Sequence, residues 1–473
     1  MTYESTTRTG SLPARLGNFV RESLRENRTD FTSGPIGRGL GLLAIPMMLE
    51  MAMEAVFALA DIVFVSLLGT NAVAAVGLTE ALVTVLYALA IGFGMGVTAM
   101  VSRRIGARRF DDAATVAGQA IWVGLGLALA IATVGLLWAE DLLELMGASD
   151  AVIAEGAGYT LVLLGGSGSI IFLFLLNAAF RGAGDAPIAL RALVLANGIN
   201  IVLDPLLIFG LGPFPELGVT GAAVATTIGR GTGVAYLAWT LFNGRGRLRL
   251  TLSSCRLVPS LVRRMVAISI GGVGQFLIAT ASWIAIMRIV ALYGSAPVAA
   301  YTIALRLIEF ALLPAWGLGN AAATLVGQNL GAGKPDRAEQ TVWRAARYNA
   351  TFMLGVGIVL VLAAAPIVAL FSDDADILRH GTACLRILGI GYPLYAVGMI
   401  IIQAMNGAGD TRTPSVMNFV CFWLLQIPLA WTLAQAAGLG PSGVFWSIVI
   451  SESMLTVLGV LVFRRGRWRS MTV

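Results

Sequence analysis

The chain has 473 residues, of which 57% are hydrophobic and only 12% are charged. Soluble domains carry about 25% charged residues, so this composition and a mean hydropathy of +0.83 exclude a soluble protein and indicate a polytopic membrane protein. The net charge of +6 does not indicate nucleic-acid binding, because the basic residues lie in loops, where membrane topology explains them.

Apolar segments of about 20 residues or more recur along the whole chain, and each is long enough to cross a bilayer. They predict an all-α polytopic fold with twelve transmembrane helices, near 39–68, 72–101, 113–138, 151–180, 188–211, 217–242, 263–292, 297–326, 341–371, 381–405, 414–437 and 441–463. Before them lies a polar, Arg-rich tail that does not resemble a cleavable signal peptide. One interfacial helix is expected in this tail, at about 12–27.

The loops divide into two sets by charge. One set is basic and includes RGRLRL at 245–250 and RRGRWR at 464–469, whereas the other includes the acidic segments AEDLLELMGASD and SDDADILRH. Positive loops face the cytoplasm. The pattern therefore predicts an inner (plasma) membrane protein with both termini in the cytoplasm, in agreement with an even number of spans.

The two halves of the chain match each other without a gap at an offset of 225 residues. RGAGD at 181–185 matches NGAGD at 406–410, and further matched positions are Gly69, Gly92, Gly94, Gly106 and Asp111 with Gly294, Gly317, Gly319, Gly331 and Asp336. Most matched glycines are interpreted as contacts between helices. The repeat predicts two pseudo-symmetric six-helix bundles related by an axis along the membrane normal.

The repeat also predicts how the chain is divided. A cytoplasmic tail (1–38) precedes an N-lobe (39–242), a cytoplasmic linker (243–262) leads to a C-lobe (263–463), and a cytoplasmic tail (464–473) ends the chain.

Asp61 lies in a long apolar run of the first predicted span. Glu50 and Glu54 lie within about 40° of it around the same helix. A carboxylate at membrane depth is costly and usually functional. The three carboxylates therefore indicate ion-coupled transport, with Glu54 as a possible accessory to Asp61 or a group in a water-filled vestibule.

A second polar group lies in the fifth predicted span. Asn200 and Asp204 share a helix face, Asn197 lies one turn earlier, and Pro205 frees a backbone carbonyl. Such oxygen atoms suit Na⁺, whereas a carboxylate in a low dielectric suits proton binding. The sequence leaves both ions open. Arg230, in the sixth span, is interpreted as extending to the cytoplasmic edge.

Several motifs, in this order and spacing, resemble the multidrug and toxic compound extrusion (MATE) family over about residues 40–465. These are ALADIVFVSLLG in the first span, RGAGD and NGAGD after the fourth and tenth, and NIVLDPLLIFG in the fifth. The resemblance implies export of cationic and amphipathic compounds in exchange for inward H⁺ or Na⁺. It also implies alternating access through a cleft between two lobes.

Within the family, the chain resembles the prokaryotic branch that is similar to DinF, which implies coupling residues in the N-lobe. The positions that match are Asp61, Tyr159, Asn200, Asp204 and, as a helix kink, Pro46. Thr226 or Thr227 serves as a sixth-span threonine, and Asn197 is a possible accessory. Sodium is expected, if at all, at Asp61, Asn200 and Asp204. Protonation or cation loss at Asp61 is expected to bend the first helix and narrow the N-lobe cavity.

The branch that resembles NorM uses acidic residues in the seventh and tenth spans, where this chain has Ala279 and Tyr395. Spans 263–292, 381–405 and 414–437 hold no carboxylate, which favours a coupling site in the N-lobe.

Other classes of protein fit less well. A lipid or lipid-linked oligosaccharide flippase also pairs six-helix bundles, but its cavity needs arginines, and most arginines here lie in loops. No metal-ligand cluster, nucleophile elbow or nucleotide-binding motif indicates an enzyme. The expected partners are small amphipathic or cationic molecules and membrane lipids, with no cofactor apart from the coupling ion and no nucleic acid. The expected state is a monomer.

Overall fold

The computed structural model describes residues 12–25 and 29–473, and its regular elements are helical throughout this part of the chain. A short helix, α1 (Leu12–Ser23), precedes the long ones. The long helices are α2 (Ile36–Ser66), α3 (Thr70–Gly106), α4 (Phe110–Leu145), α7 (Ala186–Ile208), α8 (Val219–Asn243), α9 (Pro259–Ala291), α10 (Ser295–Gly331), α11 (Pro335–Leu362), α13 (Ala375–Ala408) and α16 (Pro441–Arg464).

Two more membrane-length rods consist of shorter pieces. The first joins α5 (Asp150–Gly165) to α6 (Ser167–Ala183). The second joins α14 (Arg412–Asn418), the π-helical turn η1 (Phe419–Gln426), α15 (Ile427–Trp431) and the π-helical turn η2 (Thr432–Ala436). The remaining elements are α12 (Ala364–Ala369) and a 3₁₀ turn, η3 (Arg467–Ser470).

Eleven rods in the described part of the chain are long and apolar enough to cross a membrane. The predicted span 217–242 corresponds to α8, which is not one of these eleven because its glycines, threonines and Arg230 lower its hydropathy. The all-helical membrane fold is therefore confirmed, and each predicted span coincides with a helical rod.

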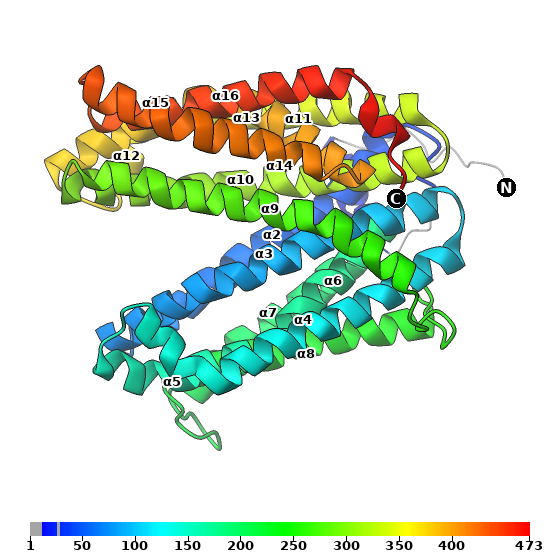
Figure 1. Cartoon of the computed structure of the whole chain (residues 1–473), viewed down its shortest axis with the longest axis horizontal. Helices are drawn as coiled ribbons and strands as arrows, with labels where there is room; N and C mark the ends of the chain where they lie inside the picture. The colour runs from blue at the N-terminus through cyan, green and yellow to red at the C-terminus, as the bar shows by residue number, and fades with distance from the viewer. Residues whose placement is uncertain (1–11, 26–28) are drawn as a thin grey trace.

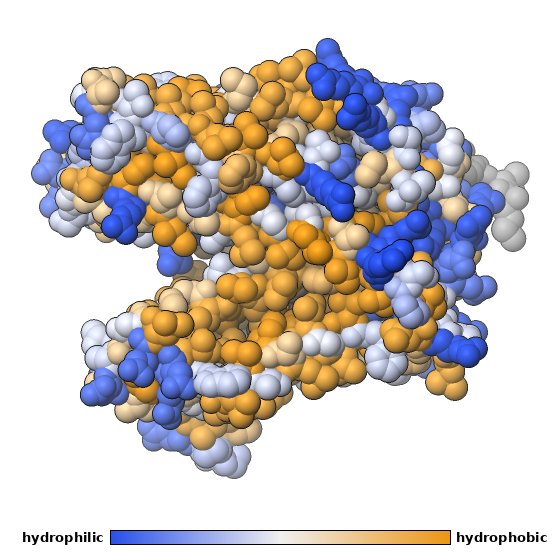
Figure 2. Space-filling view, in the orientation of Figure 1, coloured by the Kyte–Doolittle hydropathy of each residue, from blue (hydrophilic) through white to orange (hydrophobic). Residues whose placement is uncertain are grey.

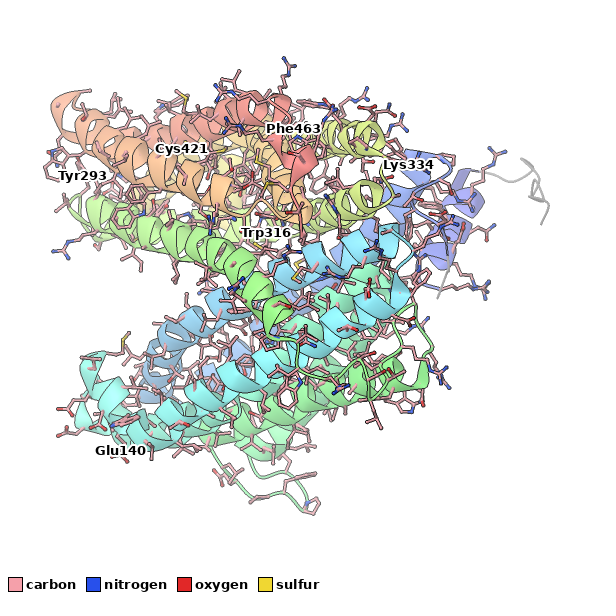
Figure 3. All side chains as sticks on the ribbon, turned by 45° about the vertical axis from the view of Figure 1, so that its right-hand side comes forward. Glu140, Tyr293, Trp316, Lys334, Cys421 and Phe463 are labelled. Carbon is pink, nitrogen blue, oxygen red and sulfur yellow. The ribbon has the colours of Figure 1, made fainter. Side chains whose placement is uncertain are left out.

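The rods form two bundles that meet at one end and diverge at the other (Figure 1). Helices α2–α8 form the N-terminal bundle and α9–α16 the C-terminal bundle. Figure 2 shows a deep hollow between the bundles, open at the end away from the C-terminus. In Figure 3, Glu140 and Tyr293 mark the separated tips of the two bundles, and Lys334 lies at the joined end.

The first helix of each bundle crosses into the other bundle. Leu40 and Met47, in the first half of α2, belong to an apolar cluster with helices α10, α11 and α13. Met265 and Ile268, in the first half of α9, lie in the main cluster of the N-terminal bundle. Each bundle therefore holds the start of the other bundle's first helix.

Glycines allow these crossings. A Cβ atom on Gly92 would overlap the backbone of Val273, and one on Gly317 would lie 2.7 Å from the backbone of Met48. Gly92 and Val273 lie 225 residues before Gly317 and after Met48, respectively, so the two contacts are related by the repeat. For these matched glycines, the interpretation as helix contacts is confirmed.

A short segment, residues 29–34, connects the two bundles at the joined end, and we call it the clasp. On one side, Arg108 pairs with Asp30 at 3.4 Å. On the other, the Lys334 ammonium donates to the carbonyl of Thr32 at 2.9 Å. Arg108 precedes α4 and Lys334 precedes α11, so the clasp bridges the two bundles.

Candidate functional site

A buried polar cluster lies between α7 and α8. The Asn200 amide nitrogen donates to Asp204 Oδ1 and to Thr226 Oγ1, both at 3.2 Å. Asp204 is 0% and Asn200 1% exposed. The helices approach closely because residue 229 is glycine: a Cβ atom there would lie 2.9 Å from Cβ of Asn200. The shared helix face predicted for Asn200 and Asp204 is thus occupied by a hydrogen-bonded pair.

The geometry distinguishes the two candidate threonines. Thr226 Oγ1 faces α7 and accepts from Asn200. Thr227 Oγ1 donates to Ala223 O of its own helix at 2.8 Å, which is a local role. Of the two, Thr226 belongs to the cluster.

Asp61 lies on α2 and is 7% exposed. It is close enough to Asp204 for the two carboxylates to interact electrostatically. Tyr159, on α5 and 4% exposed, lies within electrostatic range of both. Four helices therefore bring together Asp61, Tyr159, Asp204 and, through Asn200, Thr226.

Three oxygen atoms in this cluster lack a donor. Asp61 Oδ1, Asn200 Oδ1 and Asp204 Oδ2 are buried and accept no hydrogen bond from any described residue. Buried polar atoms are nearly always partnered, so these oxygens suit a proton or a small cation. No three His, Cys, Asp or Glu side chains converge in the described residues, so a Na⁺ ion here would also need amide, hydroxyl or backbone oxygens.

Pro46 and Asn197 support the cluster from a distance. Pro46 lies inside α2, about four turns before Asp61, and α2 runs continuously through it. The Asn197 amide donates to the carbonyl of Met53 at 3.1 Å and so fastens α7 to α2. Its amide nitrogen serves this helix contact.

The three carboxylates of α2 have different surroundings. Glu50 pairs with Arg181 of α6 at 3.2 Å, and both side chains are largely buried. Glu54 lies 3.6 Å from Arg230 of α8. Asp61 has no ion-pair partner within 4 Å among the described residues. The common helix face is therefore divided into two arginine-paired groups and Asp61.

Arg230 differs from its sequence-based interpretation. Its side chain is 2% exposed and points into the bundle, where it donates to the Tyr87 hydroxyl at 3.1 Å. The prediction that it extends to the cytoplasmic edge is wrong, because Glu54 and Tyr87 compensate its charge within the bundle. The position of Arg230 one turn after Thr226 was a signal in the sequence that it shares the face of the cluster.

The C-terminal bundle also holds an inward-facing carboxylate that the sequence patterns did not single out. Glu452 of α16 is half-buried and lies within electrostatic range of Tyr395 and Cys421. Glu452 lies in the twelfth span, which is not one of the three C-terminal spans that hold no carboxylate in the sequence. It contributes one carboxyl group, whereas Asp61 and Asp204 form an interacting pair in the N-terminal bundle.

The RGAGD and NGAGD motifs form turns. Gly184 and Gly409 have φ of +88° and +92°, and each ends a helix in the left-handed conformation that favours glycine. Asp185 accepts a hydrogen bond from the backbone of Arg247 at 2.6 Å. Asp410 accepts one from the backbone of Thr413 at 3.1 Å. These motifs therefore maintain the architecture around the cluster.

Known proteins resemble the chain over most of its length. It is 28% identical to the FAD transporter of Shewanella oneidensis over 86% of the chain and 90% of that protein. It is 26% identical to a probable multidrug resistance protein NorM of Thermotoga maritima over 96% of the chain and 98% of that protein. It is 23% identical to the multidrug export protein MepA of Staphylococcus aureus over 91% of the chain and 94% of that protein.

Solved structures resemble it equally well. A crystal structure of MATE in the straight conformation superposes with a TM-score of 0.86 at 28% identity, over 93% of this chain and 98% of that one. An outward-facing multidrug resistance MATE transporter has the same TM-score of 0.86 at 28% identity, with the same coverage. The MatE family model matches residues 46–206 and 273–432, one segment in each bundle. The chain belongs to the MatE family of membrane transporters, and not to a family of enzymes.

Proposed function

We propose that this chain is a secondary antiporter that exports amphipathic and cationic compounds in exchange for inward H⁺ or Na⁺, with Asp61 and Asp204 as the coupling site. The observation that carries the proposal is the set of three buried, donor-free oxygens on Asp61, Asn200 and Asp204. Two carboxylates in electrostatic contact favour the uptake of one positive charge. A DinF-like position within the family is part of this proposal.

The orientation follows from charge. The joined end of the bundles carries the basic loops, which favour the cytoplasm. We therefore propose that the protein lies in the inner membrane with both termini in the cytoplasm. In this orientation the hollow opens outward and the clasp closes the cytoplasmic side. The two bundles would be the functional lobes, 39–242 and 263–463, joined by the linker at 243–262, and we expect a monomer to suffice.

The crossing of α2 suggests how ion binding moves the lobe. The first half of α2 is held by the C-terminal bundle, up to the close contact of Met48 with Gly317. Asp61 lies in the second half, among α5, α7 and α8. Pro46 lies next to the point where the helix leaves one bundle for the other. Bending there would move Asp61 while the first half stays fixed, and would narrow the cavity of the N-terminal bundle.

Acidic groups of the N-terminal bundle favour cationic cargo. Glu54 and Asp61 lie on α2, and Glu80 is exposed on α3. Relatives described as multidrug resistance or multidrug export proteins support small-molecule cargo in general.

An anionic amphipathic cargo is a second candidate. One relative is described as an FAD transporter. Arg288 and Arg306 are exposed on α9 and α10, and Arg306 interacts electrostatically with Glu80 across the bundles. Arginines on the C-terminal side would suit a phosphate-bearing compound.

The test is transport in proteoliposomes with a proton or a sodium gradient imposed separately. A cationic dye and FAD would be compared as cargo, for the wild type and for Asp61→Asn, Asp204→Asn and Glu452→Gln. Gradient-driven dye movement that is lost in the two aspartate variants and kept in Glu452→Gln supports the proposal. Movement of FAD alone favours the anionic candidate. No gradient-driven movement of either turns attention to lipid-linked substrates.

A further inference from the structure

Arg230 is surrounded by groups that compensate its charge only in part. Its guanidinium lies 5.0 Å from the centre of the Phe57 ring and 3.6 Å from Glu54 Oε2, and it donates to Tyr87 at 3.1 Å. Glu54 is itself 25% exposed, and 3.6 Å is longer than a charge-assisted hydrogen bond. The guanidinium is therefore held in a buried position by a loose ion pair and an aromatic face.

The helix register places Arg230 between two carboxylates of α2. Glu54, Phe57 and Asp61 follow one another on a single face at spacings of three and four residues, so Asp61 lies one turn beyond Phe57. Glu54 and Asp61 are about 10 Å apart along the axis. An arginine stacked on Phe57 lies between them, and the charges of Arg230 and Asp61 interact.

Arg230 and Asp61, whose charges interact, both have buried atoms without a hydrogen-bond partner. Arg230 Nε and Nη1 are buried and donate to no described residue, and Asp61 Oδ1 is buried and accepts from none. A buried guanidinium with two unused donors and a buried carboxylate with an unused oxygen are each costly alone. A movement of the arginine side chain that brings them together would satisfy both.

We propose that Arg230 is the resident cation of the coupling site and makes the proton, rather than Na⁺, the coupling ion. This inference rests on the proposed function. While Asp61 carries a proton, Arg230 stays with Glu54 and Tyr87. When that proton leaves to water, the guanidinium turns to the ionised Asp61. Arg230 is a positioning and specificity residue, since it acts through Asp61.

The physical reason is competition between cations. A guanidinium stays charged at every physiological pH, so it supplies the positive charge that Na⁺ would bring to an ionised Asp61. A proton differs, because it binds the carboxylate covalently and needs no room. The other charged and titratable groups facing the site are Glu80 and Tyr87 on α3, Tyr159 on α5 and Asp204 on α7. None of these four groups is changed in the variants that test the inference.

The experiment measures ²²Na⁺ binding to purified protein, together with the pH profile of dye efflux in proteoliposomes. The variants are Arg230→Gln, Arg230→Lys and Glu54→Gln. We expect the wild type to bind Na⁺ weakly and to depend on the proton gradient. In Arg230→Gln we expect Na⁺ affinity to rise about tenfold or more, efflux to become sodium-dependent, and the pH profile to flatten.

The controls separate charge from structure. Arg230→Lys keeps a cation and should retain weak Na⁺ binding and a pH-dependent profile. Glu54→Gln removes the partner but keeps Arg230, so it should gain no Na⁺ binding. If Arg230→Gln does not fold, the double variant Glu54→Gln/Arg230→Gln removes both members of the pair, and it should still gain Asp61-dependent Na⁺ binding, lost again on adding Asp61→Asn.

Two results would overturn the inference. One is tight, Asp61-dependent Na⁺ binding by the wild type. The other is a folded Arg230→Gln or double variant with wild-type pH dependence and no gain in Na⁺ binding. Failure of the proposed function looks different, because wild-type efflux would then respond to neither gradient.

Discussion

The backbone of Gly106, at the end of α3, packs against the carbonyl group of Gln328 on α10. A Cβ atom on Gly106 would overlap that carbonyl. The same contact recurs between Gly331 and the carbonyl of Arg103, with both residues 225 positions away from the first pair. The two repeats therefore meet at the joined end through a reciprocal pair of glycine contacts, which only residues without a side chain permit.

Adding a side chain at these glycines should separate the joined end. We expect Gly106→Val and Gly331→Val to shift the protein away from this conformation or to destabilise it by about 1–3 kcal/mol or more. The added side chain would clash with backbone atoms, which cannot move aside as the end of a flexible side chain can. Distances between spin labels on the two bundles would report the shift. Gly126→Val is the matched control, since nothing lies within 4 Å of a Cβ atom at that helical glycine. An unchanged distance distribution and melting temperature in Gly106→Val would contradict the prediction.

Removing the amide of Asn200 should impair coupling. Asn200→Ala leaves Asp204 Oδ1 without the donor that the structure provides, and hydrogen bonds to charged groups contribute about 1.5–3 kcal/mol. We expect ion-driven efflux to fall about tenfold or more while the protein still binds dye. Thr227→Val is the control, because that hydroxyl bonds within its own helix. Equal losses in the two variants would argue against a specific role for Asn200.

The buried pair of Glu50 and Arg181 should behave as a structural unit. Glu50→Gln leaves Arg181 buried and unpaired and should cost about 3–5 kcal/mol, whereas replacing both partners should cost much less. The measurement is thermal unfolding of the purified single and double variants. Glu54→Gln is a useful comparison and should cost less, because that ion pair is longer, 3.6 Å against 3.2 Å, and Arg230 keeps its hydrogen bond to Tyr87. A double variant no more stable than Glu50→Gln would show that the pair is not coupled.

The clasp should be insensitive to pH near neutrality. Burial raises the pKa of Asp30, but hydrogen bonds from Thr32 and the charge of Arg108 outweigh it, so this pKa lies below its ordinary value. Ionised Asp30 therefore stabilises the folded protein fully at any pH above the pKa of the unfolded chain, about 3.9. This stabilisation is lost only as pH falls through the lower pKa of the folded state. Asp30→Asn should therefore change the efflux rate by a similar factor at every pH from 5 to 8, roughly the cellular range. A variant whose pH optimum moves would show that Asp30 takes part in coupling.

Much of the site was predictable from local patterns. An aspartate in an apolar run and an Asn–Asp pair four residues apart identify the faces of α2 and α7, because helical spacing fixes which side chains lie together. Pairing across helices was not predictable. Glu50 and Asp61 share a face of α2, yet Arg181 from α6 pairs with Glu50, while the charges near Asp61 come from Glu80 of α3, Asp204 of α7 and Arg230 of α8. Partners on distant parts of the chain leave no trace in a local pattern.

The sequence by itself determined the helical membrane fold, the number of rods and the two-fold repeat, because hydropathy, length and a constant offset are properties of the chain alone. It also predicted that carboxylates lie within the membrane-length helices. Only the tertiary structure decided that α2 belongs to both bundles, that Thr226 rather than Thr227 joins Asn200, and that Arg230 turns inward to Glu54. Those outcomes depend on which helices approach closely, and close approach is set by packing around residues such as Gly229 and Gly317, whose effect appears only when a second helix lies against them.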